Sequence, residues 1–154
     1  MEIERLGDLR LEIEAQVLVA GEAAGAALVL AEPLSLWGGL NPETGEIIDR
    51  RHPQAGEIVT GKVLVLPSGR GSSSASSILL EAVRAGTAPV AIITAVPDGI
   101  LALGAAVACE MYDNAPPVLV VATAVYSQIH TGDKIAIEED GRLTVVSGPA
   151  APDI

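Results

Sequence analysis

The fold of this chain is decided by residues 62–86, KVLVLPSGRGSSSASSILLEAVRAG. The run from Val63 to Leu66 is continuously apolar, which is typical of a strand buried on both faces. Glycines and serines follow, and then a helix-like apolar pattern that begins near Ser76 and stops at Gly86, a frequent helix terminator. We therefore predict a buried strand that delivers a glycine- and serine-rich turn to the N-terminus of a helix.

The alternation of strand and helix continues after Gly86. Residues 89–96 and 117–122 contain short apolar runs, and residues 99–111 between them have a helical pattern. Strand, helix, strand, helix, strand with continuously apolar strands indicates a parallel βαβαβ unit with right-handed crossovers. The turn after Leu66 then lies at the carboxyl end of a parallel strand, where open α/β sheets bind their ligands.

Further strands are predicted on either side of this unit, and they share an alternation of apolar and polar side chains. These strands are residues 10–18, 26–30, 134–138 and 142–146. We interpret glycines 21 and 25 as breaks before the second strand and Asp140-Gly141 as the tight turn of a hairpin. Together they should build a small β-barrel-like half packed with the parallel unit, a mixed α/β fold. Residues 1–154 are expected to form one domain, with 147–154 as a flexible tail.

Residues 35–54 differ in composition from both halves and predict a long surface loop. The segment contains the turn Trp37-Gly38-Gly39 and a tight Asn-Pro turn, which indicate an ordered shape. Two interpretations remain open at this point, namely a solvated excursion and a segment that faces a substrate. His52 lies among polar residues of this segment, and we expect its side chain to be solvated.

The turn after Leu66 has the composition of an anion-binding site. Free backbone N–H groups at a helix start attract carboxylates and phosphates, and glycines let a ligand approach the backbone closely. Arg70 adds a cation, and five serines lie between positions 72 and 77. A helix needs only one serine as its N-cap, so we favour a ligand-facing role over a purely capping role.

Two common loop classes are excluded by the residues themselves. The turn lacks the lysine that follows the last glycine of a Walker A loop, and it lacks the G-x-S-x-G alternation of hydrolases. The only histidines, His52 and His130, lie in distant segments, and nothing in the sequence places either beside a serine as a base. A serine protease or esterase is therefore not favoured.

The composition narrows the class of protein further. A formal net charge of -11 argues against a nucleic-acid partner, because phosphate backbones are bound by clustered Lys and Arg. No apolar run reaches the length of a membrane span and no signal-like segment opens the sequence, so a cytoplasmic protein is expected. The single cysteine, Cys109, cannot by itself hold a metal site, and its apolar setting predicts a small buried side chain.

Several separated motifs, read in order, resemble the small subunit or swivel domain of the aconitase X family. The motifs are PLSLWGG at 33–39, NPETG at 41–45, residues 58–65, GRGS at 69–72 and APVA at 88–91. Because they cover roughly residues 10–146, the resemblance is far more specific than a single glycine-rich loop.

The resemblance implies a swivelling β/β/α fold and a role as the small subunit of a heteromeric dehydratase. It implies a separate large subunit that carries an iron–sulfur cluster on its own cysteines, while this chain binds no cofactor alone. In the family, the first serine after Gly-(Lys/Arg)-Gly abstracts the proton, and this role transfers onto Ser72. The residues expected to bind a small carboxylate substrate are Gly69, Arg70, Gly71, Ser73, Trp37, Gly38 and Gly39.

The family contains dehydratases of cis-3-hydroxy-L-proline and of mevalonate 5-phosphate. The archaeal phosphomevalonate loops typically carry two cations. Here the corresponding positions are Ser68 and Arg70, which leaves one cation. A phosphate site benefits from two. The segment Glu110-Met111-Tyr112 is similar to bacterial members, so we favour hydroxyproline as the substrate. A non-catalytic anion-binding module and a purely structural subunit remain as alternatives.

Overall fold

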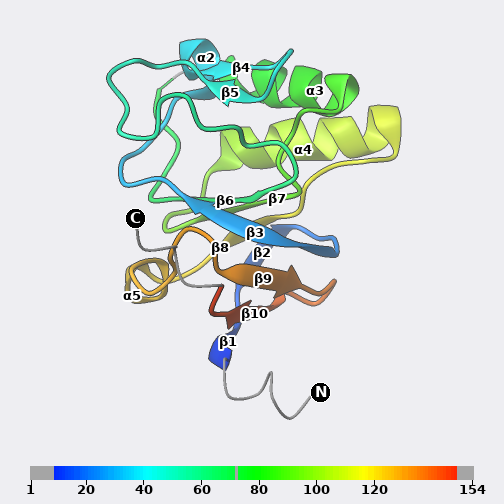
Figure 1. Cartoon of the computed structure of the whole chain (residues 1–154). Coiled ribbons are helices and arrows are strands. Elements are labelled where there is room, and N and C mark those ends of the chain that lie inside the picture. The colour runs from blue at the N-terminus through cyan, green and yellow to red at the C-terminus, as the bar shows by residue number, and fades with distance from the viewer. Residues whose placement is uncertain (1–8, 72, 149–154) are drawn as a thin grey trace.

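The computed structural model describes residues 9–71 and 73–148, and Figure 1 shows two helices above a strongly curved sheet. The sheet strands are β1 (Leu9–Glu14), β2 (Gln16–Val19), β3 (Ala23–Val29), β6 (Val63–Leu66), β7 (Ala91–Thr94), β8 (Val118–Val120), β9 (Lys134–Ile137) and β10 (Arg142–Val146). The helices are α3 (Ala75–Ala85) and α4 (Gly99–Tyr112), with shorter turns at α2 (Leu36–Gly39) and α5 (Thr123–Tyr126). A two-stranded ribbon consists of β4 (Leu40–Asn41) and β5 (Glu46–Ile47).

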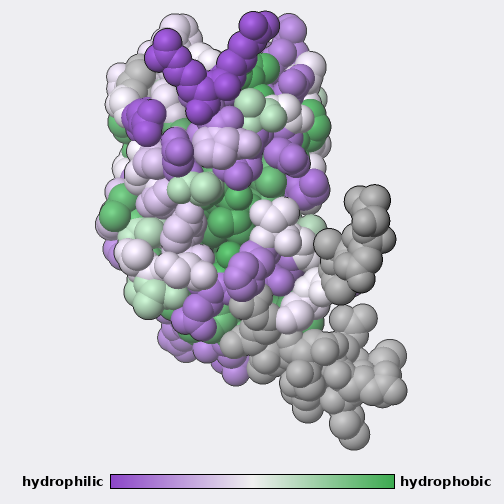
Figure 2. Space-filling view, turned by 60° about the vertical axis from the view of Figure 1, so that its left-hand side comes forward, coloured by the Kyte–Doolittle hydropathy of each residue, from purple (hydrophilic) through white to green (hydrophobic). Residues whose placement is uncertain are grey.

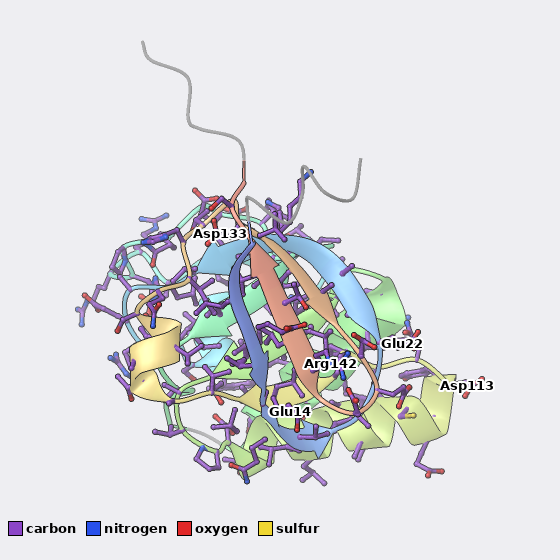
Figure 3. The ribbon with its side chains drawn as sticks, turned by 90° about the horizontal axis from the view of Figure 1, so that it is seen from below. Glu14, Glu22, Asp113, Asp133 and Arg142 are labelled. Atoms are coloured by element: carbon purple, nitrogen blue, oxygen red, sulfur yellow. The ribbon has the colours of Figure 1, made fainter. Side chains whose placement is uncertain are left out.

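The eight sheet strands lie in the order β1-β10-β9-β3-β6-β7-β8-β2. The pairs β3–β6, β6–β7 and β7–β8 are parallel, which confirms the predicted parallel unit, and the other pairs are antiparallel. The predicted hairpin around Asp140-Gly141 is also confirmed as β9 and β10. Viewed from below, Glu14 and Arg142, which are paired in register, lie at one end of the β1–β10 ladder and Asp133 lies near the other (Figure 3).

The prediction of one strand over residues 10–18 is wrong, because the chain changes partner at Ala15. β1 pairs with β10 before this residue, and β2 pairs with β8 after it. Since β1 and β2 are the two outer strands, Ala15 joins the edges of the sheet into a nearly closed barrel. The Ala15 N–H donates to the carbonyl of Gly141 at 3.0 Å, which holds the point of change against the β9–β10 turn.

β3 links the two halves of the molecule, because it also changes its pairing partner along its length. Residues 23–26 pair with β9, and residues 27–29 pair with β6. The interpretation of Gly25 as a break is therefore wrong. Its position is explained by a close approach instead, because a Cβ there would lie 3.0 Å from the carbonyl oxygen of Gly61.

Two separate apolar cores confirm the three layers of a β/β/α fold. Val63 and Val65 of β6 belong to the core inside the barrel, whereas Leu64 and Leu66 belong to the core beneath α3 and α4. Every residue of β6 is buried, as expected for a strand covered on both faces. The order of the layers can be followed from top to bottom in Figure 1.

The segment 35–54 is anchored in the apolar core and is not a fully solvated excursion, although much of it is exposed. Leu36, Leu40 and Ile47 are all buried. The expectation that His52 is solvated is wrong, since its side chain is only 5% exposed. Its Nδ1 accepts from the Gln54 N–H at 3.0 Å, so the proton resides on Nε2, which donates to the Glu32 carbonyl at 3.0 Å. This polar side chain therefore serves hydrogen bonds inside the fold rather than contact with water.

Apolar side chains also reach the surface, and Figure 2 shows green hydrophobic side chains across the middle of one side of the molecule. Trp37 and Leu103 are 58% and 57% exposed. Cys109 is exposed on α4, so the prediction of a buried cysteine is wrong. α4 is apolar almost all round, and composition alone could not show which of its faces is covered. None of the helices in the described ranges is both long and apolar enough to cross a membrane.

Ser147 and Gly148 are the last described residues of the predicted tail. The Gly148 N–H donates to an Asp133 carboxylate oxygen at 3.4 Å. Residues 149–154, and with them most of the predicted flexible tail, lie outside the described residues.

We predict that Gly141→Ala destabilises the chain by about 3 kcal/mol, because a Cβ there would overpack the junction at Ala15 as well as strain the backbone. The φ of Gly141 is +92°, and its Cβ would lie 2.6 Å from Val17 Cγ2. Gly56 provides a matched control, because its φ is +94° and nothing lies within 4 Å of the same position. Gly56→Ala should cost only about 1 kcal/mol in urea unfolding, and equal losses for the two variants would contradict this account of barrel closure.

We predict that His52→Leu lowers the free energy of unfolding by about 1–3 kcal/mol, because it leaves the Gln54 N–H and the Glu32 carbonyl without their partner. His130→Leu is the control, since the His130 side chain is 65% exposed. It should change the stability by less than about 0.5 kcal/mol. Thermal and urea unfolding of both variants measure this, and an unchanged His52→Leu would show that the loop does not depend on the histidine.

Candidate functional site

The glycine-rich turn leaves the carboxyl end of β6, as predicted. Pro67 extends the pairing of the sheet by one hydrogen bond, because its carbonyl accepts the Ala95 N–H at 3.1 Å. Gly69 then forms a parallel bridge with Leu34, so the turn runs beside the start of the segment 35–54. Gly71 has a φ of +86°, a backbone conformation that favours glycine. The turn is therefore fixed by both neighbouring segments before it reaches α3.

The serines after the turn are only partly explained by helix capping. α3 begins after Ser74, whose side chain makes no capping hydrogen bond to the helix. The Ser76 hydroxyl donates back to the carbonyl of Ser73 at 2.9 Å, which is a local structural role. Ser72, the predicted proton-abstracting residue, lies outside the described residues.

A cavity of about 220 Å³ opens at this edge of the sheet. Its walls come from the turn, from the starts of α3 and α4 and from the segment that enters α2. They comprise Leu34, Leu36, Gly69, Arg70, Gly71, Ala75, Asp98, Ile100 and Leu101. Arg70 supplies a cation and Asp98 a carboxylate, while the remaining walls are apolar or glycine. An apolar hollow with a few convergent polar groups is the usual form of a small-molecule site.

The structure brings together only some of the predicted substrate-binding residues. Gly69, Arg70 and Gly71 line the cavity. Trp37, Gly38 and Gly39 do not line it, although their neighbours Leu34 and Leu36 do. Gly39 is buried against Leu34, whereas Trp37 and Gly38 are exposed. Ser73 is exposed and lies outside the cavity wall as well.

Asp98 is a cavity residue that the sequence reasoning missed. It is the N-cap of α4, and its Oδ1 accepts the N–H groups of Ile100 and Leu101 at 3.0 Å each. The signal was present in the sequence, because an aspartate before a helix at the end of the strand next to β6 must lie at the same edge.

A second, larger hollow of about 320 Å³ lies between the end of α3 and the start of β7. Glu22, Gly86 and Pro116 are among its lining residues. It lies at the amino ends of the parallel strands, and it contains neither the glycine-rich turn nor a helix N-terminus. The smaller cavity beside Arg70 is therefore better suited to bind an anionic ligand.

The donor set of this chain does not fit an iron–sulfur cluster. Such clusters are held by several cysteine thiolates, and the sequence has one cysteine. Across residues 9–71 and 73–148, no group of three or more His, Cys, Asp or Glu side chains is arranged to hold a metal ion. Cys109 lies on α4 and does not line the cavity.

Comparison with curated proteins finds two kinds of relative. The chain is 48% identical over 103 residues to the cis-3-hydroxy-L-proline dehydratase of Pseudomonas aeruginosa, an overlap of 67% of this chain and 18% of that protein. It is 34% identical over 142 residues to the phosphomevalonate dehydratase small subunit of Methanopyrus kandleri. The overlap is 92% of this chain and 94% of that protein.

The chain thus spans about a fifth of the length of the hydroxyproline dehydratases it matches, with 22% coverage of the Hypocrea jecorina enzyme as well. Among solved structures, the crystal structure of holo-form Thermococcus kodakaraensis aconitase X is similar, with a TM-score of 0.79 and 30% identity. The match covers 89% of this chain and 99% of that one. A family model described as the aconitase X swivel domain matches residues 12–145. This chain belongs to the aconitase X swivel domain family.

Proposed function

We propose that this chain is the small part of an aconitase-type dehydratase, which removes water from a hydroxy acid. The observation that carries the proposal is the cavity at the end of β6, where the Gly69–Gly71 turn places Arg70 beside apolar walls. A cation among backbone N–H groups suits a carboxylate, and the apolar walls suit a small carbon skeleton.

A larger partner completes the enzyme in this proposal. The relatives named as hydroxyproline dehydratases are about five times as long as the matched region, and others are named small subunits. Trp37 follows the lining residue Leu36 directly in the chain, and 58% of its surface is exposed. An exposed tryptophan held between the buried Leu36 and the buried Gly39 is suited to contact another protein surface.

The iron–sulfur cluster belongs to the partner in this proposal. The cysteine content of this chain leaves it without a ligand set of its own. The cluster would provide Lewis-acid assistance for departure of the substrate hydroxyl. The residues of this chain would bind the carboxylate and move the proton.

Ser72 is the residue that we propose to take the proton alpha to the carboxylate. A serine hydroxyl is a weak base at neutral pH, so its deprotonated form needs stabilisation from nearby donors. The backbone N–H groups around Gly71 and the guanidinium of Arg70, which precede Ser72 in the chain, are candidates. Arg70 could alternatively clamp the substrate carboxylate, and the two roles predict different kinetics.

We propose cis-3-hydroxy-L-proline as the substrate. The 48% identity to a protein named for this activity supports it, as does the presence of one cation rather than two in the turn. Mevalonate 5-phosphate is the second candidate. It is favoured by one observation, namely that a relative named for phosphomevalonate is a separate small subunit of nearly the same extent.

The deciding experiment is an anaerobic assay of the chain co-expressed with the larger cysteine-bearing partner. We expect turnover of cis-3-hydroxy-L-proline at more than about ten times the kcat/KM for mevalonate 5-phosphate, a difference of at least 1.4 kcal/mol in transition-state binding. The opposite preference would replace our substrate with the second candidate. Turnover of neither substrate by a cluster-loaded complex would contradict the proposed function.

Ser72→Ala should lower kcat by about 10²–10⁴-fold, because it removes the proposed proton acceptor. Ser77→Ala is the matched control, since Ser77 is exposed on α3 and does not line the cavity. Assembly with the partner is checked by gel filtration for both variants. A Ser72→Ala complex that assembles and retains full activity would remove the serine from the mechanism.

Arg70→Gln should raise KM by roughly 10- to 100-fold with a smaller effect on kcat if Arg70 clamps the substrate carboxylate. A fall in kcat with little change in KM would instead assign Arg70 to stabilising the serine oxyanion. Arg50→Gln, a change of the same charge at an exposed position outside the cavity, should leave both constants unchanged. Wild-type kinetics for Arg70→Gln would contradict both roles.

A further inference from the structure

Asp98 connects the two loops that form the cavity. One of its carboxylate oxygens, Oδ1, accepts the N–H groups of Ile100 and Leu101 and so caps α4. The other oxygen, Oδ2, points to the neighbouring turn, where it occupies the space beside Gly69. A carboxylate from the loop after β7 is therefore packed against the loop after β6.

This packing accounts for the glycine at position 69. A Cβ on residue 69 would lie 2.2 Å from Asp98 Oδ2 and 3.4 Å from its Cγ. Gly69 is not among the glycines with positive φ, so its backbone does not require glycine. The close approach of Asp98 is the remaining reason, and the two residues are matched in shape.

We infer that Asp98 is a positioning residue for the proposed dehydration, acting by seating its second carboxylate oxygen against Gly69. This inference rests on the proposed function. Helix capping uses Oδ1 alone, which leaves the contact of Oδ2 unexplained by capping. The contact fixes where the turn leaves β6 relative to α4, and so it sets the place of Arg70 in the cavity wall. A misplacement of about 1 Å in such a group can cost 10²-fold in rate.

Substitutions at position 98 separate positioning from capping. Ser and Asn both cap helices well, so Asp98→Ser and Asp98→Asn should unfold at the same urea midpoint as the wild type. Only Asn fills the space beside Gly69, because Ser lacks the second polar atom. We expect the Asp98→Asn complex to keep kcat within about 3-fold of wild type and the Asp98→Ser complex to lose about 10-fold or more.

A second substitution tests the contact itself. Gly69→Ala should lower kcat by about 10²-fold, because the new methyl group collides with Oδ2 and displaces the turn. Asp98→Ser removes the colliding atom, so the double variant Gly69→Ala/Asp98→Ser should be more active than Gly69→Ala alone. Independent sites would instead give a double variant whose loss is the product of the two single losses.

The outcomes distinguish this inference from the proposed function. The wild-type complex is assayed first, and its failure to dehydrate either candidate acid overturns the proposed function and the inference with it. If the wild type is active, wild-type kcat for Asp98→Ser overturns the inference alone and leaves Asp98 as a cap. A double variant whose loss in kcat is the product of the two single losses also overturns the inference alone. Loss in Asp98→Ser at an unchanged unfolding midpoint, with rescue of Gly69→Ala, supports the positioning role.

Discussion

Burial of β6 on both faces is the constraint on which the rest of the structure depends. Its four side chains alternate between two cores, with Val63 and Val65 in the barrel and Leu64 and Leu66 under the helices. Each fully buried aliphatic side chain is worth about 1.5–3 kcal/mol, so the strand is fixed in position and register. The turn that follows the strand is held further by the bridge between Gly69 and Leu34 and by the packing of Asp98 against Gly69. The position of the glycine-rich turn and of its cavity depends on this strand.

The parallel unit could be predicted from the sequence because its strands are continuously apolar and its helices end at clear signals. The barrel half was harder, since two of its strands change partner. A strand that pairs with β10 and then with β8 looks in sequence like one uninterrupted strand, and nothing local marks Ala15 as the point of change. The segment 35–54 was misjudged for a related reason. A polar side chain can satisfy hydrogen bonds inside the fold, as His52 does with Glu32 and Gln54.

Of the candidate site, the sequence predicts the residues that lie within the glycine-rich turn. Gly69, Arg70 and Gly71 are contiguous in sequence, and the strand before them gives their position at the edge of the sheet. Asp98 comes from the neighbouring loop. Its place at this edge follows from the helix that it caps, but no pattern in either loop marks its contact with Gly69. Trp37 is conspicuous in an aromatic-poor sequence, but its exposure depends on how the buried Leu36 anchors its turn.

In the proposed enzyme, a turn on this small chain becomes an active site only when a larger partner covers it. The most direct test measures dehydration of cis-3-hydroxy-L-proline by the chain alone, by the cluster-loaded partner alone and by the two mixed in increasing ratio. We expect no turnover by either component alone and a rate that rises with added chain until the two are equimolar. Turnover by the partner alone at the rate of the mixture would contradict this proposal.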